Sequence, residues 1–256
     1  MEQMQPEVSV IIPAYQAGPF IRQTIQSVLD QTYEGLIEIL VIDDGSTDNT
    51  EAEVAGFLRK ETGNRTVRYF RNEQNQKVAG TRNRGVQEAE GTYIAFLDAD
   101  DLWEASKLEK QMKCLQENPD AAFCFTGREL LDAEGNRTQK VIPVPAEVSF
   151  SDMLKTNYVT CSSVVMKREP AAAFPMDHDE YCEDYICWMR ILKEGKKAIG
   201  INEPLVKYRM VAGSKSNNKK KAALNHYHSL RILGLGPVRA LFHMISYAYN
   251  GIRKYT

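Results

Sequence analysis

The sequence predicts an α/β fold in which a mostly parallel central sheet is flanked by helices and followed by a helical extension. Over residues 8–101, short apolar runs alternate with stretches of helical periodicity. Strands that alternate with helices form parallel sheets joined by right-handed crossovers. Two of the apolar runs stop at acidic residues, and ligands of such sheets bind just beyond the carboxyl ends of the strands. We therefore expect the functional site at that edge of the sheet.

The first hundred residues contain the predicted strands and helices in strict alternation. The strands are expected at residues 8–13, 37–42, 67–70 and 92–97, and the helices at residues 21–31, from residue 48 or 50, and at residues 81–89. In the first helix, Ile21, Ile25 and Val28 recur at helical spacing. The second helix begins at Asp48 or Thr50, each of which has a glutamate three residues later, as in a capping box.

Residues 102–212 are less regular, with the mixed elements typical of a substrate-facing half. A helix is expected at residues 108–118, strands at residues 121–126, 159–166 and 203–207, and a further helix at residues 180–194. That last helix carries Tyr181, Tyr185 and Trp188 along one face. Residues 213–256 then comprise a flexible basic loop and an aromatic-rich helical tail.

Composition limits the classes of protein that need to be considered. A chain of 256 residues, 43% hydrophobic and 26% charged, suits one sizeable globular domain with an appendage. The net charge of −2 gives no support for nucleic-acid binding. Five cysteines without C-x-x-C spacing argue against a disulfide scaffold or zinc site and favour a reducing cytoplasm. We expect no signal peptide at the N-terminus and no transmembrane span.

The most informative stretch is the apolar run at residues 94–97, which ends in Asp98, Asp100 and Asp101. Three carboxylates in so short a segment repel one another unless a cation lies among them. Mg²⁺ and Mn²⁺ prefer one or two carboxylates together with phosphate oxygens. The pattern therefore predicts Mg²⁺ or Mn²⁺ bridging this loop to an anionic ligand.

A second acidic strand end, Asp43-Asp44-Gly45-Ser46, is expected at the same edge of the sheet. A carboxylate there can accept a hydrogen bond from a base N–H or a ribose hydroxyl. The alternative is a turn and helix cap, which these residue types also favour. Its pairing with the acids at residues 98–101 favours the ligand interpretation.

Three further candidates each have a structural alternative. Arg82, near the start of a helix, suits an anionic or carbonyl-rich ligand, or else lies on a solvated basic face. Arg209 and the loop that follows it are expected to form a lid that closes over a diphosphate, or else a surface loop with solvated charges. Asp184 is a candidate general base with a raised pKa. Its structural alternative is an acid in the first turn that stabilises the helix.

These segments occur together in the order of a known family. The motifs are Val8-Ser9-Val10-Ile11-Ile12-Pro13-Ala14-Tyr15, Val41-Ile42-Asp43-Asp44-Gly45-Ser46-Thr47-Asp48, Thr81-Arg82-Asn83, Tyr93-Ile94-Ala95-Phe96-Leu97-Asp98-Ala99-Asp100-Asp101, Glu183-Asp184-Tyr185 with Trp188, and Tyr208-Arg209. Over residues 8–220 the chain resembles family 2 glycosyltransferases of the GT-A fold, most nearly bacterial enzymes that build teichuronic acid, capsule or O-antigen chains. The resemblance implies a Rossmann-like GT-A domain at residues 1–212, with a nucleotide-sugar-binding half (8–101) and an acceptor-binding half (102–212).

The resemblance also implies roles for the residues that match the family's nucleotide-binding motifs. Asp43 would read the base of a nucleoside diphosphate, and UDP is the expected nucleotide. The segment containing Pro13 and Tyr15, together with Arg82, would help Asp43 to recognise this base. These residues are therefore the expected donor-binding set.

The same resemblance implies a metal and a catalytic base. Asp98 would approach the ribose or the metal, and Asp100 would coordinate Mg²⁺ or Mn²⁺ on the diphosphate. The family's catalytic base falls on Asp184. Family members often have a histidine two places after the Tyr-Arg pair, where this chain has Val211. Arg209, and Lys215 in the loop beyond it, would then carry more of the phosphate charge.

The implied activity is the inverting transfer of a sugar from a nucleotide-sugar donor to a hydroxyl of a cell-surface polysaccharide or lipid-linked glycan. Three alternatives remain open on the sequence. A pyrophosphorylase-like nucleotidyltransferase usually has a Gly-rich, Arg-containing loop after its first strand, where this chain has Pro13-Ala14-Tyr15-Gln16-Ala17-Gly18. The others are a phosphoryl-transfer enzyme with an aspartyl nucleophile and a non-catalytic nucleotide-sugar-binding protein.

The tail is open to two interpretations. Its basic residues, Arg231, Arg239, Arg253 and Lys254, alternate with Leu235, Leu241, Phe242, Tyr247 and Tyr249. One interpretation is an amphipathic segment on the inner face of the cell membrane, near a lipid-linked acceptor. The other is a C-terminal helix packed on the domain. The expected location is the cytoplasm, with or without peripheral membrane contact.

Overall fold

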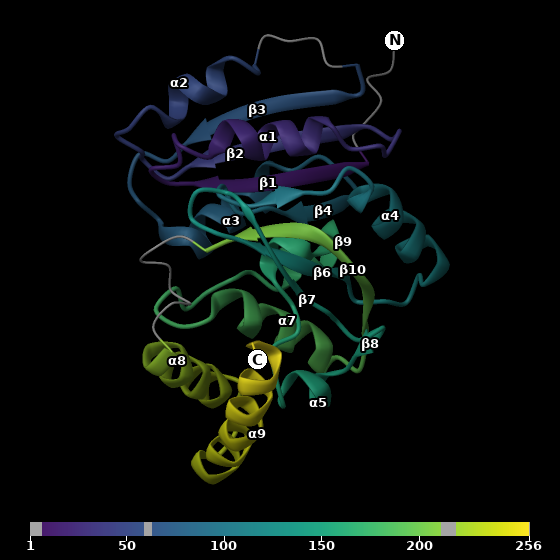
Figure 1. The fold of residues 1–256 in the computed structure, drawn as a ribbon, viewed down its shortest axis with the longest axis vertical. Coiled ribbons are helices and arrows are strands. Elements are labelled where there is room, and N and C mark those ends of the chain that lie inside the picture. Colours follow the sequence, from purple (N-terminus) through teal and green to yellow (C-terminus); the bar gives the residue numbers. More distant parts are fainter. Residues whose placement is uncertain (1–6, 59–62, 211–218, 256) are drawn as a thin grey trace.

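The computed structural model describes residues 7–58, 63–210 and 219–255, and these residues form one mixed sheet covered by helices (Figure 1). The strand order is β3-β2-β1-β4-β9-β6-β10-β5, with β7 beside β6 and β8 beside β10. The first four strands are β1 (Val8–Ala14), β2 (Ile37–Asp43), β3 (Arg65–Arg71) and β4 (Tyr93–Phe96). They pair in parallel throughout, so their carboxyl ends meet at one edge, as expected.

The second part of the sheet mixes parallel and antiparallel pairs. Its strands are β5 (Leu102–Trp103), β6 (Cys124–Leu131), β7 (Arg137–Ile142), β8 (Glu147–Val148), β9 (Val165–Lys167) and β10 (Ala198–Arg209). The short β9 lies antiparallel between β4 and β6 and so joins the two parts, while β10 runs parallel to β6.

Helices cover both faces of this sheet, because its strands bury apolar side chains on both sides. One face packs against α1 (Ile21–Leu29), α2 (Thr50–Ala55) and α4 (Lys107–Glu117). The other packs against α3 (Lys77–Glu88), α5 (Phe150–Met153), α6 (Arg168–Ala173) and α7 (Glu183–Lys193). Successive side chains of β1 point to opposite faces of the sheet, so that Val10 and Ile12 face the first group of helices and Ile11 faces the second.

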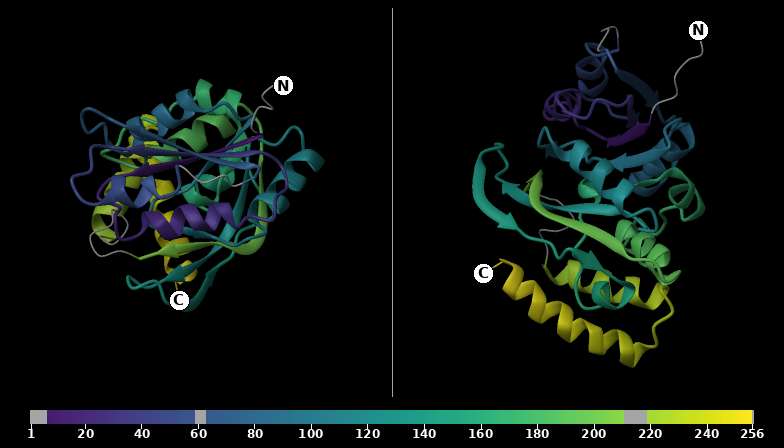
Figure 2. Two further views of the ribbon diagram at one scale, coloured as in Figure 1. Left: turned by 90° about the horizontal axis from the view of Figure 1, so that it is seen from above. Right: turned by 90° about the vertical axis from the view of Figure 1, so that its right-hand side faces the viewer.

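The tail forms two helices, α8 (Lys219–Ile232) and α9 (Pro237–Tyr255). They join through a turn in which Gly234 adopts a positive φ of 89°. Leu230 and Ala240 bring α8 and the start of α9 into the core beside α7. Both helices lie at the end of the molecule opposite β3 (Figures 1 and 2). No helix in the described parts of the chain combines the length and apolarity needed to span a membrane.

Several local expectations were wrong in detail. Residues 159–166 are not one strand: the 3₁₀ turn η1 (Cys161–Ser163) precedes β9. The strand expected at residues 203–207 is much longer, because β10 starts at Ala198. His226 in α8 is buried and stacked against Tyr247, with ring centroids 3.9 Å apart. Val211 and Lys215 lie outside the described residues.

Candidate active site

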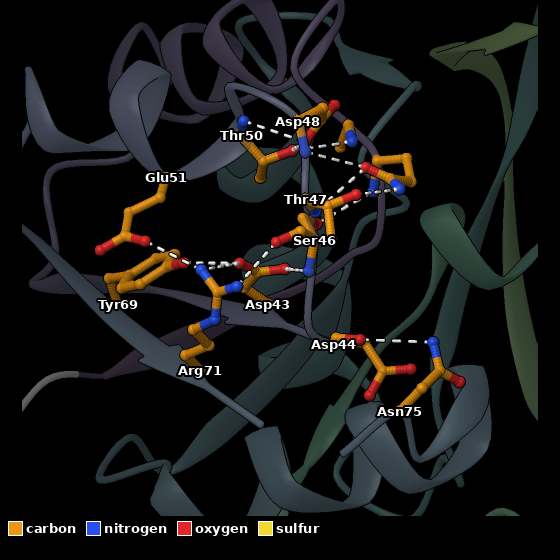
Figure 3. Close-up of polar contacts among 12 residues, drawn as sticks. Asp43, Asp44, Ser46, Thr47, Asp48, Thr50, Glu51, Tyr69, Arg71 and Asn75 are labelled. Carbon is orange, nitrogen blue, oxygen red and sulfur yellow. Dashed lines mark hydrogen bonds and ion pairs between the residues drawn. The ribbon is translucent and has the colours of Figure 1, made fainter. Parts of the chain in front are cut away.

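The loops after β1 and β2 are hydrogen-bonded to each other at the carboxyl edge of the sheet. The backbone N–H of Gln16 donates to Ser46 Oγ at 2.9 Å, and the Gln16 amide oxygen accepts from the backbone N–H groups of Thr47 and Asp48. Asp48 in turn accepts from Thr50 at the start of α2 (Figure 3). The Asp-Gly-Ser-Thr turn therefore fixes the shape of this rim, as its turn chemistry predicts.

Asp43 is the last residue of β2 and is fully buried. One carboxylate oxygen accepts from the Ser46 N–H at 2.9 Å, and the other accepts from the Tyr69 hydroxyl at 2.5 Å (Figure 3). Arg71 adds an ion pair at 3.7 Å. Each carboxylate oxygen has a second lone pair, so these contacts orient Asp43 without using all its acceptor capacity.

Pro13 and Tyr15 lie beside Asp43 at the end of β1, where Ala14 is the partner of Asp43 in the parallel register. Pro13 is half-buried and fixes the backbone, whereas the Tyr15 side chain is 57% exposed. An exposed aromatic ring at a strand end next to a buried carboxylate is suited to stacking on a planar ligand.

Arg82 lies at the centre of the candidate site. Its guanidinium is almost fully buried in α3 and reaches Asp98 Oδ1 at 2.5 Å and Glu183 Oε1 at 3.1 Å. Burial alone would lower the pKa of Arg82, but the charge of Asp98 and the other acids outweighs it and raises that pKa well above its usual value. The alternative of a solvated basic face is therefore wrong for this residue. Arg82 connects the loop after β4 to the first turn of α7.

Asp98 and Asp100 follow β4 and are both partly exposed. Burial, followed by the neighbouring Asp98 charge, raises the pKa of Asp100 to about 6. The charge crowding expected from the sequence is thus present, and Arg82 relieves it at Asp98 but not at Asp100. Of these two acids, Asp100 is the one without an ion pair to Arg82, so it has more to gain from an added cation.

Asp101 has a different environment from the other two acids. It is buried, and its carboxylate accepts from the Ser162 hydroxyl at 2.6 Å and from the backbone N–H of Arg209 at 3.0 Å. It therefore anchors the loop to η1 and β10. It does not anchor the next helix, because β5 follows it directly and α4 begins only at Lys107.

Arg209, at the end of β10, also holds this loop. Its Nε donates to the carbonyl oxygen of Asp100 at 3.0 Å, and Nη2 donates to the Gln23 side chain at 3.3 Å. The guanidinium lies over the Phe20 ring, 5.0 Å from its centroid. Arg209 is buried, so the interpretation of it as a solvated surface residue is wrong.

Asp184 occupies the first turn of α7, directly after the Glu183 that binds Arg82. One of its carboxylate oxygens accepts from the Tyr185 N–H at 2.7 Å. Burial and the Glu183 charge raise the pKa of Asp184 to about 6, against the opposing effect of Arg82. Asp98 also raises it, so the two acids lie within electrostatic reach of each other. A carboxylate of this kind is ionised at neutral pH and basic enough to accept a proton.

The two acids after β4 fit a divalent cation in a specific way. Within the described ranges, no three His, Cys, Asp or Glu side chains gather so as to hold a metal by themselves. Asp98 and Asp100 would supply carboxylate oxygens, and burial together with the Asp98 charge raises the pKa of Asp100. Mg²⁺ and Mn²⁺ typically take only one or two carboxylates and complete their coordination with phosphate oxygens and water. The donor set fits a metal that arrives with a phosphate ligand.

Sequence reasoning missed the partners that position these side chains. Glu183 was noted only as the neighbour of Asp184, yet it pairs with an arginine 101 residues earlier. Ser162 was not singled out, yet its hydroxyl accepts from the Asp98 N–H and donates to Asp101. The only available signal was the adjacency of Glu183 to Asp184.

Solved structures with a similar fold define the class of protein. The chain matches Staphylococcus aureus TarS residues 1–349 in complex with UDP-GlcNAc with a TM-score of 0.70 and 16% identity, covering 93% of this chain and 70% of that one. It matches the mannosyltransferase PcManGT from Pyrobaculum calidifontis, in complex with GDP-Man and Mn²⁺, with a TM-score of 0.65 and 18% identity, covering 96% and 70%. The fold is therefore that of the GT-A glycosyltransferases.

The sequence comparison narrows this class to one family. Residues 9–173 match the model of glycosyl transferase family 2, so the chain belongs to that family and is a glycosyltransferase. It is 36% identical over 255 residues, 99% of each chain, to the putative teichuronic acid biosynthesis glycosyltransferase TuaG of Bacillus subtilis. It is 33% identical, over 97% of this chain and 94% of the other, to WfgD of Escherichia coli, a UDP-Glc:α-D-GlcNAc-diphosphoundecaprenol β-1,3-glucosyltransferase. The family leaves the pyrophosphorylase and phosphoryl-transfer alternatives without support.

Proposed function

We propose that this enzyme transfers a sugar from a UDP-sugar donor to a hydroxyl of a cell-surface glycan or lipid-linked acceptor, with inversion at the anomeric carbon. The names of its relatives support this choice of substrates: TuaG is assigned to teichuronic acid biosynthesis, and WfgD uses UDP-Glc and a diphosphoundecaprenol-linked acceptor. TarS was solved with UDP-GlcNAc. We propose that the enzyme works in the cytoplasm, which its five free cysteines without C-x-x-C spacing favour.

The observation that carries the proposal is the pair of ion contacts made by Arg82. Through them the acidic loop after β4 and the first turn of α7 share one buried cation. Asp100 and Asp184 both have a pKa raised to about 6 in this surrounding. A site with one carboxylate suited to a metal and another suited to accept a proton meets the two needs of sugar transfer.

The first half of the chain, residues 8–101, is proposed to bind the donor. The nucleobase would stack on Tyr15 beside Pro13 and hydrogen-bond to Asp43, and Asp98 would face the ribose. Arg82 would act on the donor by orienting Asp98, with which it is already paired. Residues 102–212 would present the acceptor.

Asp98 and Asp100 would hold Mg²⁺ or Mn²⁺ together with the diphosphate oxygens of the donor. When bound, the metal supplies Lewis-acid stabilisation of the negative charge on the departing nucleoside diphosphate. Arg209 positions this loop through the Asp100 carbonyl. We propose that Arg209 also contributes positive charge on the phosphate side.

Asp184 is the proposed general base. It removes the proton from an acceptor hydroxyl while that oxygen attacks the anomeric carbon on the face opposite the nucleoside diphosphate. The new carbon–oxygen bond forms as the bond to the diphosphate oxygen breaks, and the leaving group carries away the electron pair. The proton ends on Asp184, and a single displacement of this kind inverts the configuration without a covalent enzyme intermediate.

A thermal-shift screen tests the donor. A ligand that binds only the folded form raises the melting temperature, so a UDP-sugar with Mn²⁺ is expected to raise it more than Mn²⁺ alone, and more than a GDP-sugar with Mn²⁺. The proton NMR signal of the product's anomeric hydrogen then tests the stereochemistry. A larger shift with a GDP-sugar would refute the UDP assignment, and retained configuration would refute the single displacement.

A further inference from the structure

Helix α9 has an exposed apolar stripe that the proposed chemistry does not use. Val238, Leu241, Phe242 and Ile245 are 82%, 62%, 68% and 68% exposed, respectively. Their spacing of three and four residues places them on one face of the helix. Scattered exposed apolar residues are ordinary, but four large ones in a continuous stripe indicate an interaction surface.

The opposite face of α9 already packs on the domain. Ala240 is fully buried, Met244 packs against the core, and Tyr247 stacks on His226. The helix is thus apolar on two opposite faces, and within the described residues only one of them is covered. Packing on the domain therefore explains half of the apolar pattern and leaves the outer stripe unexplained.

A cleft of about 600 Å³ opens beside the start of this stripe, between α5, the end of α7 and the α8–α9 turn. Val238 and Phe242 belong both to the stripe and to the cleft lining. The lining is mainly apolar, and its charged members, Lys193 and Arg239, are exposed cations. No acidic residue is among the described residues that line it. An apolar cleft with two cations at its edge suits an amphiphile with a negative head.

The net charge is distributed unevenly along the chain, and the C-terminal part is positive. Residues 204–256 contain ten Lys or Arg and no Asp or Glu, whereas the whole chain has a net charge of −2. The first 203 residues therefore carry −12, and the remaining 53 carry +10. Seven of these ten cations belong to α8 and α9, which lie at the end of the molecule opposite β3 (Figure 2), whereas Lys207 and Arg209 belong to β10 in the sheet. The helix that carries the apolar stripe is therefore part of a basic helix pair without an acidic residue.

We propose that the outer face of α9, with Lys193 and Arg239 at its edge, docks on an anionic phospholipid bilayer. The apolar stripe enters the interface between headgroups and acyl chains, and the basic segment is attracted to the negative surface. A second copy of the chain is disfavoured as the occupant, because a symmetric contact through this face would bring together two helix pairs that each hold seven Lys or Arg and no Asp or Glu. This proposal concerns a surface separate from the active site and does not depend on the sugar that is transferred.

Vesicle flotation of the full-length chain tests the proposal. Vesicles of phosphatidylcholine mixed with phosphatidylglycerol are expected to carry the protein upward, less so at high salt, and phosphatidylcholine alone much less. The variant Leu241→Gln/Phe242→Gln is expected to bind the mixed vesicles at least roughly tenfold more weakly. Lys193→Gln/Arg239→Gln is expected to bind the mixed vesicles roughly tenfold more weakly than the wild type and to bind phosphatidylcholine vesicles equally well.

Leu58→Gln is the matched control, since Leu58 is an exposed leucine that follows α2 at the opposite end of the molecule. It is expected to float like the wild type, and all variants are expected to keep the wild-type melting temperature and its shift with a UDP-sugar. The proposal is wrong if the wild type stays unbound, or if Leu241→Gln/Phe242→Gln floats equally well. It is also wrong if sedimentation finds a dimer that this variant converts to monomers while vesicle binding is absent.

Discussion

At the scale of single residues, the state of Asp184 sets the expected pH dependence. Burial and the Glu183 charge raise its pKa to about 6. A protonated carboxyl cannot accept the acceptor's proton, so kcat/KM is expected to rise with pH up to about 6 and then level off. Below that pH the loss approaches tenfold per pH unit. Initial rates across pH at saturating Mn²⁺ measure this, and a profile that is flat down to pH 4 would exclude Asp184 as the base.

Asp100 is expected to reduce the stability of the enzyme at neutral pH. Its folded-state pKa of about 6 exceeds the ordinary value of 3.8. The folded state therefore binds its proton more tightly, and stability falls as pH rises from about 4 to 6. Asp100→Asn is expected to raise the free energy of unfolding at pH 7 by about 1–2 kcal/mol, a discounted share of the pKa shift.

Urea unfolding in the presence of UDP, with and without Mn²⁺, measures both parts of this prediction. Mn²⁺ is expected to stabilise the wild type more than Asp100→Asn, because the variant lacks the carboxylate proposed to bind it. Glu134→Gln, a change of similar chemistry in the exposed β6–β7 turn, serves as the control. A less stable Asp100→Asn, or an equal response to Mn²⁺, would contradict the proposed metal role.

Residue-scale features were predictable where they depend on neighbours in the sequence. The crowding of Asp98 and Asp100 follows from their spacing, and the structure contains it. The partners of Arg82 were not predictable, because Glu183 lies 101 residues away and pairing at that distance depends on the tertiary fold. The sequence therefore identified the charges but not which of them neutralise each other.

At the scale of elements, Asp101 links the loop after β4 to β10 and η1. Asp101→Ala would leave the Arg209 N–H and the Ser162 hydroxyl buried without this acceptor. We expect a loss of about 2–3 kcal/mol in the free energy of unfolding. Asp101→Asn keeps one acceptor oxygen and is expected to lose less than half as much. Equal stability of Asp101→Ala and the wild type, measured by urea unfolding, would show that this link is not needed for the fold.

The elements that sequence patterns predicted well are those with strong periodicity. Strands β1 and β2 are buried on both faces and read as continuous apolar runs, and α1 buries Ile21, Ile25 and Val28 as expected. The short β9 was merged with η1, because a strand of three residues is held by its neighbours β4 and β6 more than by its own pattern.

At the scale of the whole molecule, one sheet carries both parts of the site. Asp43 ends β2, Asp98 follows β4 and Arg209 ends β10, and β9 joins the parallel first part to the second. The GT-A fold was predictable from the ordered set of motifs. The position of α9 was not, because its sequence is apolar on two faces and only packing decides which one is covered.

The central claim is that the donor site and the catalytic base are separate groups joined through Arg82. The most direct test compares Asp184→Asn with the wild type in two assays, namely equilibrium binding of a labelled UDP-sugar with Mn²⁺ and single-turnover transfer to acceptor. Donor affinity is expected to stay within about twofold, while the transfer rate falls by roughly 10²–10⁴-fold, the usual effect of losing a general base. Normal transfer by Asp184→Asn, or a loss of donor binding equal to the loss of transfer, would contradict the account.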